Sequence, residues 1–156
     1  MNTSAQRFLH SLFGDAPAGT FLLLWTLQDR RSAWFRADRL GEAAAYAADI
    51  GQHGDVYAGC GLRGRDHGEH ARGEVAHVVA ISGTWCDLDV AKPGATKPYF
   101  KTRGDATVFL DDLPIPPTLR MWTGGGYHGW WLFREPWLFG DADDRDRASR
   151  CFLSQA

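Results

Sequence analysis

The sequence has few cysteines, no long hydrophobic run and no excess of basic residues, and each shortage excludes a class of protein. Its three cysteines are too few and too scattered for a disulfide framework or a paired-cysteine zinc site. The longest apolar run, residues 21–25, is far too short to span a membrane. The N-terminus lacks the charged start and apolar segment of a signal peptide. We therefore expect a cytoplasmic protein that makes no contact with a membrane.

The charge balance excludes a strong overall attraction to nucleic acid. The chain of 156 residues has 17 Lys and Arg against 19 Asp and Glu, so its net charge is −2. Any binding to nucleic acid would have to come from a local basic face. Hydrophobic residues make up 44% of the sequence, which is ordinary for a globular protein, and the length fits one domain with a sizeable core.

Hydrophobic periodicity predicts an α+β protein, with helices on one face of a mostly antiparallel sheet. A helix is expected after Asp38, which would be its N-cap, as far as Gly51 or Gly54. The other expected helices cover residues 5–13, 106–113 and 141–156. The expected strands cover residues 20–27, 32–37, 55–63, 75–90 and 127–133, and a polar loop is expected at 64–74.

Two aspartates lie one residue apart in the apolar stretch GTWCDLDV, residues 83–90. Because side chains alternate along a strand, Asp87 and Asp89 should share a face with Trp85, about 6–7 Å apart. Leu88 should then face the core. Two carboxylates on one face can bind a hard divalent cation, Mg²⁺ or Mn²⁺. The alternative is a strand that runs into a turn, with Asp89 capping the following loop.

A second unusual stretch, TGGGYHGWW, covers residues 123–131. Its glycine turn would leave backbone N–H groups free and would let a phosphate approach the backbone closely. Thr123 adds a hydroxyl, and His128 could donate a hydrogen bond to a phosphate oxygen. The nucleotide-binding residues predicted in this stretch are Thr123, Gly124, Gly125, Gly126 and His128. The alternative is a tight hairpin with a histidine that is satisfied structurally.

A basic and aromatic loop follows the aspartates at residues 91–105. Lys97, Lys101 and Arg103 could bind template phosphates, while the neighbouring aromatics could stack on a base. The alternative is a solvated loop whose aromatics fold back on the core. Arg63 ends the strand 55–63 and is a further candidate for binding phosphate.

Together these motifs resemble the primase-polymerase domain of the archaeo-eukaryotic primase superfamily, in the branch found in phage and plasmid replication proteins. The resemblance rests on the Asp-x-Asp strand at Asp87 and Asp89, and on a small-x-His motif that ends at His128. The strand that ends at Arg63 is similar to the segment before the first motif. The resemblance covers residues 20–137, with the motifs in the expected order.

The resemblance implies a fold, a reaction and a set of partners. The fold would be an RNA-recognition-motif-like catalytic sheet, residues 55–156, beside an N-terminal αβ unit, residues 1–54, in one domain. Asp87 and Asp89 would hold Mg²⁺ or Mn²⁺, and His128 with Arg63 or a nearby lysine would contact the triphosphate of an incoming nucleotide. The partners would be a single-stranded DNA template, a ribo- or deoxyribonucleoside triphosphate, and a fused or associated helicase.

The chain departs from this family in its third motif, which should be a carboxylate on a strand after the last helix. The sequence reaches Ala156 within or just after that helix. We expect either a piece of a longer replication protein or a metal site that has lost one ligand. The aspartates at the helix start are expected to pair with the helix dipole: Asp141, Asp143, Asp144 and Asp146. Thr123 replaces the more usual serine and keeps the hydroxyl.

The sequence therefore predicts a nucleotidyltransferase that makes or extends primers by two-metal phosphoryl transfer. Two other functions remain open. A catalytically inactive nucleotide- or single-stranded-DNA-binding module, or a fragment, would fit the missing third carboxylate. A metal-dependent phosphodiesterase could use the same aspartates and His128.

Overall fold

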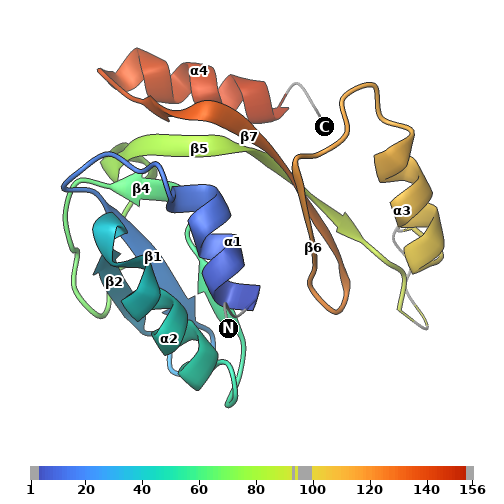
Figure 1. Ribbon diagram of the computed structural model, residues 1–156, viewed down its shortest axis with the longest axis horizontal. Helices are drawn as coiled ribbons and strands as arrows, with labels where there is room; N and C mark the ends of the chain where they lie inside the picture. Colours follow the sequence, from blue (N-terminus) through green and yellow to red (C-terminus); the bar gives the residue numbers. More distant parts are fainter. Residues whose placement is uncertain (1–3, 93, 95–99, 154–156) are drawn as a thin grey trace. The chain divides into compact units, whose positions relative to one another are not determined.

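The computed structural model describes residues 4–92, 94 and 100–153. Within them it contains four α-helices and a seven-stranded sheet, in an α+β arrangement (Figure 1). The helices are α1 (Ser4–Phe13), α2 (Leu40–Ile50), α3 (Arg103–Asp111) and α4 (Ala142–Leu153). The strands are β1 (Phe21–Thr26), β2 (Ser32–Arg36), β3 (Val56–Ala58), β4 (Gly61–Arg63), β5 (Val78–Asp89), β6 (Leu119–Trp122) and β7 (Gly126–Leu138).

The sheet has the strand order β2-β1-β4-β5-β7-β6, and β3 also pairs with β1. The pairs β1–β2, β1–β3, β1–β4, β4–β5 and β6–β7 are all antiparallel. The predicted α+β class and the mostly antiparallel sheet are therefore confirmed.

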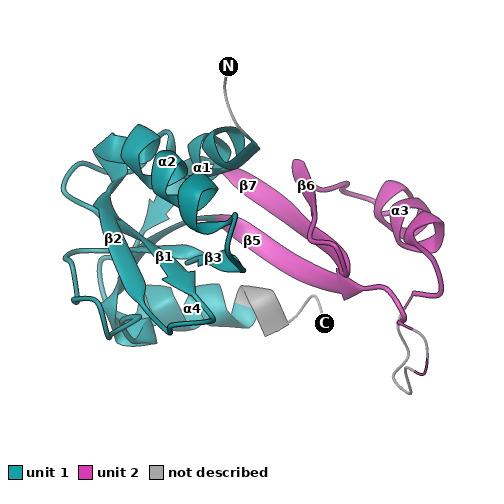
Figure 2. Ribbon diagram, turned by 90° about the horizontal axis from the view of Figure 1, so that it is seen from below, with its two compact units in different colours: residues 1–82, 134–156 teal, residues 83–133 magenta. Residues whose placement is uncertain are grey.

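The chain divides into two compact units, coloured separately in Figure 2. The first comprises residues 1–82 and 134–156, and the second residues 83–133. Strands β5 and β7 each contribute residues to both units. The predicted limits of the N-terminal unit and the catalytic sheet, at residue 54, stay a prediction.

The first unit has a core of aliphatic side chains from its helices and strands. Leu9, Leu12 and Phe13 of α1 are buried, as are Leu22, Leu24 and Leu62 of the strands. Both views place α4 on the other side of these strands from α1 and α2 (Figures 1 and 2). The prediction that helices cover only one face is therefore wrong for this unit.

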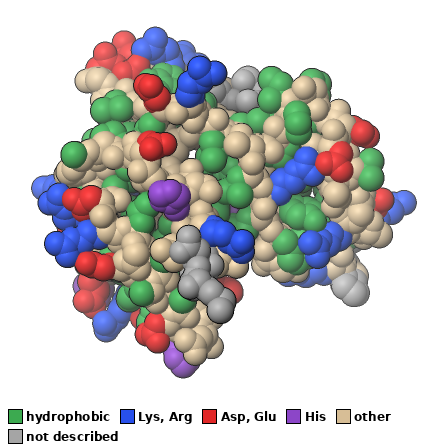
Figure 3. All heavy atoms as spheres, viewed as in Figure 1, with side chains coloured by type: hydrophobic (Ala, Val, Ile, Leu, Met, Phe, Trp, Pro, Cys, Tyr) green, Lys and Arg blue, Asp and Glu red, His purple; other side chains and the backbone are tan. Residues whose placement is uncertain are grey.

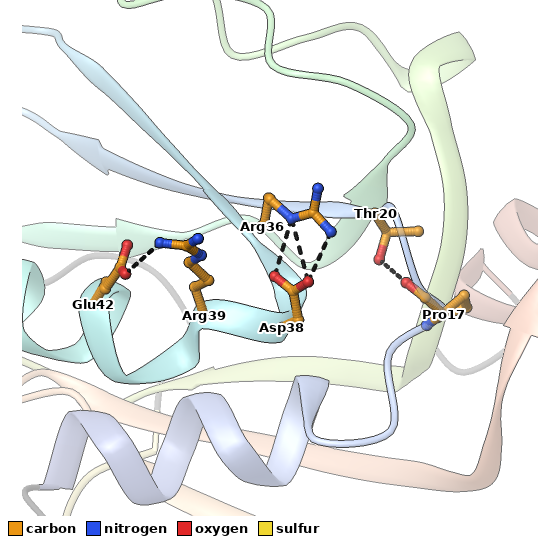
Figure 4. A network of polar contacts seen from close by, with 6 residues as sticks. All are labelled: Pro17, Thr20, Arg36, Asp38, Arg39 and Glu42. Atoms are coloured by element: carbon orange, nitrogen blue, oxygen red, sulfur yellow. Dashed lines mark hydrogen bonds and ion pairs between the residues drawn. The ribbon is translucent and has the colours of Figure 1, made fainter.

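Two local predictions for the first unit are also wrong. The strand expected at 55–63 is divided into β3 and β4, and between them the amide of Gly59 donates to the carbonyl of Leu23 in β1. Asp38 does not cap α2, because its carboxylate accepts hydrogen bonds from the guanidinium of Arg36 (Figure 4). Arg39 stands at the N-cap instead and makes no capping hydrogen bond through its side chain.

The second unit contains the C-terminal part of β5, the N-terminal part of β7, and the whole of β6 and α3. Leu88, Ala106, Leu110 and Trp130 are its buried hydrophobic residues. Helix α3 begins three residues earlier than predicted. The hydroxyl of Thr102 accepts from the amide of Asp105, and the carboxylate of Asp105 accepts from the amide of Thr102. This reciprocal capping box satisfies two amides at the helix start.

Candidate functional site

The two aspartates of β5 lie on one face of the strand, as the alternation predicts. Asp87 and Asp89 are exposed, whereas Leu88 between them is only 6% exposed. The strand ends just beyond them, where the amide of Val90 donates to the carbonyl of Gly125 in the glycine turn. The carboxylates therefore stand at the end of a strand, with their main chain fixed by the neighbouring hairpin.

His128 of β7 lies beside the first aspartate. Its Nε2 is 3.6 Å from Oδ1 of Asp87, and the two side chains are 29% and 50% exposed. The ring of Trp85 is 5.5 Å from the imidazole, centroid to centroid, and stacks on Trp130 at 5.8 Å. The sequence predicted that Trp85 shares a face with the two aspartates, but it did not indicate that two tryptophans support the histidine.

Two of the three glycines between β6 and β7 stand where a larger residue would not fit the backbone. Gly124 has a φ of +94°, a conformation that residues with a Cβ rarely adopt. A Cβ on Gly126 would lie 2.3 Å from the carbonyl oxygen of Leu88. The glycine at position 126 therefore allows β7 to approach β5 closely.

Thr123 closes the turn. Its amide and its hydroxyl both donate to the carbonyl of Gly126, at 2.9 and 3.1 Å. The hydroxyl proton is therefore used within the hairpin, which is a structural role. Its predicted part in nucleotide binding stays a prediction.

Arg103 lies on the other face of the hairpin from His128. Its Nε donates to the hydroxyl of Tyr127 at 2.8 Å, and its guanidinium carbon lies 4.6 Å from the ring centroid of Trp122. Hydrogen bonds donated by Thr107 and by Arg103 lower the pKa of Tyr127. Because Tyr127 and His128 are adjacent on β7, their side chains point to opposite faces.

The three residues predicted to bind DNA have different surroundings in the structure. Arg103 is held by aromatic rings on the face that α3 covers, away from the aspartates. Lys101 is exposed. Lys97 lies outside the described residues.

Arg63 belongs to the first unit, at the end of β4. Its Nη1 donates to the carbonyl of Gly61, and its buried Nε has no hydrogen-bond partner in the described chain. Burial lowers the pKa of this guanidinium. The structure does not bring Arg63 and the aspartates together in one unit, so its predicted contact with a triphosphate stays a prediction.

The aspartates at the start of α4 include two that cap the helix. Asp141 accepts from the amide of Asp144 at 3.0 Å, and Asp144 accepts from the amide of Gly140 at 2.8 Å. Asp144 also pairs with Arg147. Both carboxylates therefore have a structural role at the start of α4.

The residues available for a metal ion are Asp87 and Asp89. Across the described ranges, no group of three or more His, Cys, Asp or Glu side chains is arranged to hold a metal. Two exposed carboxylates nevertheless suit Mg²⁺, which commonly binds one or two carboxylates and completes its shell with water and substrate phosphates. The donor set therefore fits a hard cation that is bound together with a phosphorylated ligand.

Comparison with protein-family models, with curated proteins and with solved structures finds no match to this chain. In the part of the chain that the structure describes, no helix has the length and apolar character needed to cross a membrane.

Proposed function

We propose that this chain is the primase-polymerase domain of a replication protein and transfers nucleotides to a primer on a single-stranded DNA template. The observation that carries the proposal is the approach of His128 to Asp87, 3.6 Å apart on neighbouring strands, with Asp89 on the same face. This geometry supports a site in which two carboxylates bind a metal ion and His128 donates a hydrogen bond to a phosphate oxygen of the same triphosphate. The three-strand arrangement β5-β7-β6, with α3 on the opposite face, suits an RNA-recognition-motif-like catalytic sheet.

Each of these side chains has a role in the proposed reaction. Asp87 and Asp89 would hold Mg²⁺ or Mn²⁺, which stabilises the charge on the attacking and leaving oxygens. His128 would donate to a phosphate oxygen and orient the triphosphate, since Trp85 restricts its ring. Asp87 lies 3.6 Å from His128 and would help to keep the imidazole at this end of β5 until the nucleotide arrives.

A second function is favoured by one observation. Among the described residues no third carboxylate joins the pair on β5. A domain with only two ligands could bind nucleotide or single-stranded DNA without incorporating it. This inactive module differs from the polymerase in chemistry and not in what it binds.

The proposal is tested by nucleotide incorporation on a primed single-stranded DNA template with Mn²⁺. We expect Asp89→Ala to lower incorporation by at least about a hundredfold, because the metal site loses one of its two carboxylates. Asp112→Ala is the matched control, since Asp112 is an exposed aspartate at the end of α3. Incorporation that persists unchanged in Asp89→Ala would refute the assigned site. Nucleotide binding without incorporation by the native chain would favour the inactive module.

A further inference from the structure

The glycine turn has two backbone donors without acceptors. The amides of Gly124 and Gly125 make no hydrogen bond within the described residues, whereas the carbonyl of Gly125 accepts from Val90. Gly124 is exposed and Gly125 partly so. Successive free amides in a turn with positive φ form a concave group of donors that suits an anion.

A lysine stands beside this turn. A Cβ built on Gly125 would lie 3.8 Å from Cε and 3.9 Å from Nζ of Lys92. Lys92 is exposed, and its ammonium takes part in none of the ion pairs between described residues. Because Gly125 has no side chain, the ammonium can lie close to the backbone of the turn.

The same turn borders the aspartates. A Cβ on Gly126 would lie 3.1 Å from the Cα of Asp89, so the turn and the end of β5 are in contact. Two carboxylates repel a phosphate that approaches them. A cation on the turn side offsets this repulsion and gives the phosphate a second point of attachment.

We infer that Lys92, together with the amides of Gly124 and Gly125, binds one phosphate of a nucleoside triphosphate. This inference rests on the proposed function and assigns to it a phosphate-binding residue on the loop that follows β5. The lysine acts as a point charge, which tolerates several phosphate geometries, while the two amides fix the position of the oxygen. Lys92 is a binding residue in this scheme and takes no part in proton transfer.

The test measures binding and needs no turnover. Equilibrium dialysis at constant Mg²⁺ compares a nucleoside triphosphate with the corresponding nucleoside for the native chain and three variants. We expect Lys92→Gln to weaken triphosphate binding by about tenfold and to leave nucleoside binding unchanged, because a charge-assisted contact is lost. Lys92→Arg should restore most of the affinity. Arg150→Gln is the control, because Arg150 is an exposed cation on α4 with no assigned binding role, and this variant should bind as the native chain does.

The outcomes separate this inference from the proposed function. Equal triphosphate affinity in the native chain and in Lys92→Gln overturns the inference and leaves the polymerase proposal standing. Lys92-dependent binding by a chain that incorporates no nucleotide supports the inference and overturns polymerase activity. A native chain that binds no triphosphate overturns both.

Discussion

Arg63 is the residue whose surroundings are least favourable to its charge. Its guanidinium is partly buried, and among the described residues its Nε has no acceptor and no carboxylate forms an ion pair with it. Burial of a charge without a partner destabilises a folded protein. A residue that destabilises the fold in this way often binds a ligand, because the ligand supplies the missing partner for its charge.

Arg63→Met is therefore expected to raise the free energy of unfolding by about 1 kcal/mol, since methionine keeps an apolar stem and removes the unpaired donor. Chemical denaturation checks this. The control is Arg65→Met, because Arg65 is exposed two residues away and its replacement should change stability by less than about 0.5 kcal/mol. A clear loss of stability in Arg63→Met would mean that the guanidinium already has a favourable partner. Weaker triphosphate binding by the same variant would support the predicted role of Arg63.

At the scale of elements, the contact of β7 with β5 depends on the missing side chains of two glycines, Gly83 of β5 and Gly126 of β7. A Cβ on Gly126 would lie 2.3 Å from the carbonyl oxygen and 3.0 Å from the carbonyl carbon of Leu88. Both atoms belong to the backbone, so a side chain could be admitted only if the strands separate. That movement would also shift His128 away from Asp87.

Gly126→Ala is accordingly expected to lower the free energy of unfolding by about 2–3 kcal/mol, as overpacking does in close-packed interiors. Thermal or chemical denaturation gives the measurement. Gly104→Ala makes a useful contrast within α3, because its Cβ would meet the Thr102 hydroxyl only at 3.5 Å. Alanine there should stabilise the helix by up to about 1 kcal/mol. Equal stability of Gly126→Ala and the native chain would contradict the close approach of the two strands.

The elements that the sequence predicted correctly are those with short-range signals. The β1–β2 hairpin, the helix that ends before Gly14 and the glycine turn before β7 each follow from neighbouring residues. The division between β3 and β4 could not be predicted, because it depends on how the two segments pair with β1, which is far away in the sequence. The start of α3 was predictable from Thr102 and Asp105, which match the capping-box pattern.

The candidate site was also predictable only in part, namely where it depends on neighbouring residues of one strand. Alternation along a strand was enough to place Asp87 and Asp89 on one face, but the support of His128 by Trp85 depends on which strands are neighbours. The separation of Arg103 from the aspartates depends on the pairing of Trp122 with Tyr127 across β6 and β7. Strand order is a property of the folded chain, and the sequence pattern alone did not supply it.

At the scale of the whole molecule, the balance of charge limits how strongly the chain can bind DNA. The net charge is −2. On the face shown in Figure 3, Lys and Arg side chains of the described residues are interspersed with Asp and Glu. Nonspecific attraction to a phosphate backbone should therefore be weak, and any binding should depend on a few lysines.

Single-stranded DNA binding is expected to involve about two or three phosphates, so the logarithm of the binding constant should fall against the logarithm of salt concentration with a slope of about −2. Replacing both Lys97 and Lys101 with Gln should reduce this slope by about 1.4, because two phosphate contacts are lost. Fluorescence anisotropy of a labelled oligonucleotide over a salt series measures this slope.

Arg103→Gln provides the comparison. Arg103 already contacts Trp122 and Tyr127, so its loss should lower the stability of the chain and leave the slope unchanged. A slope that changes with Arg103 and not with the lysines would show that DNA follows the face of the sheet next to α3, opposite the proposed metal ligands.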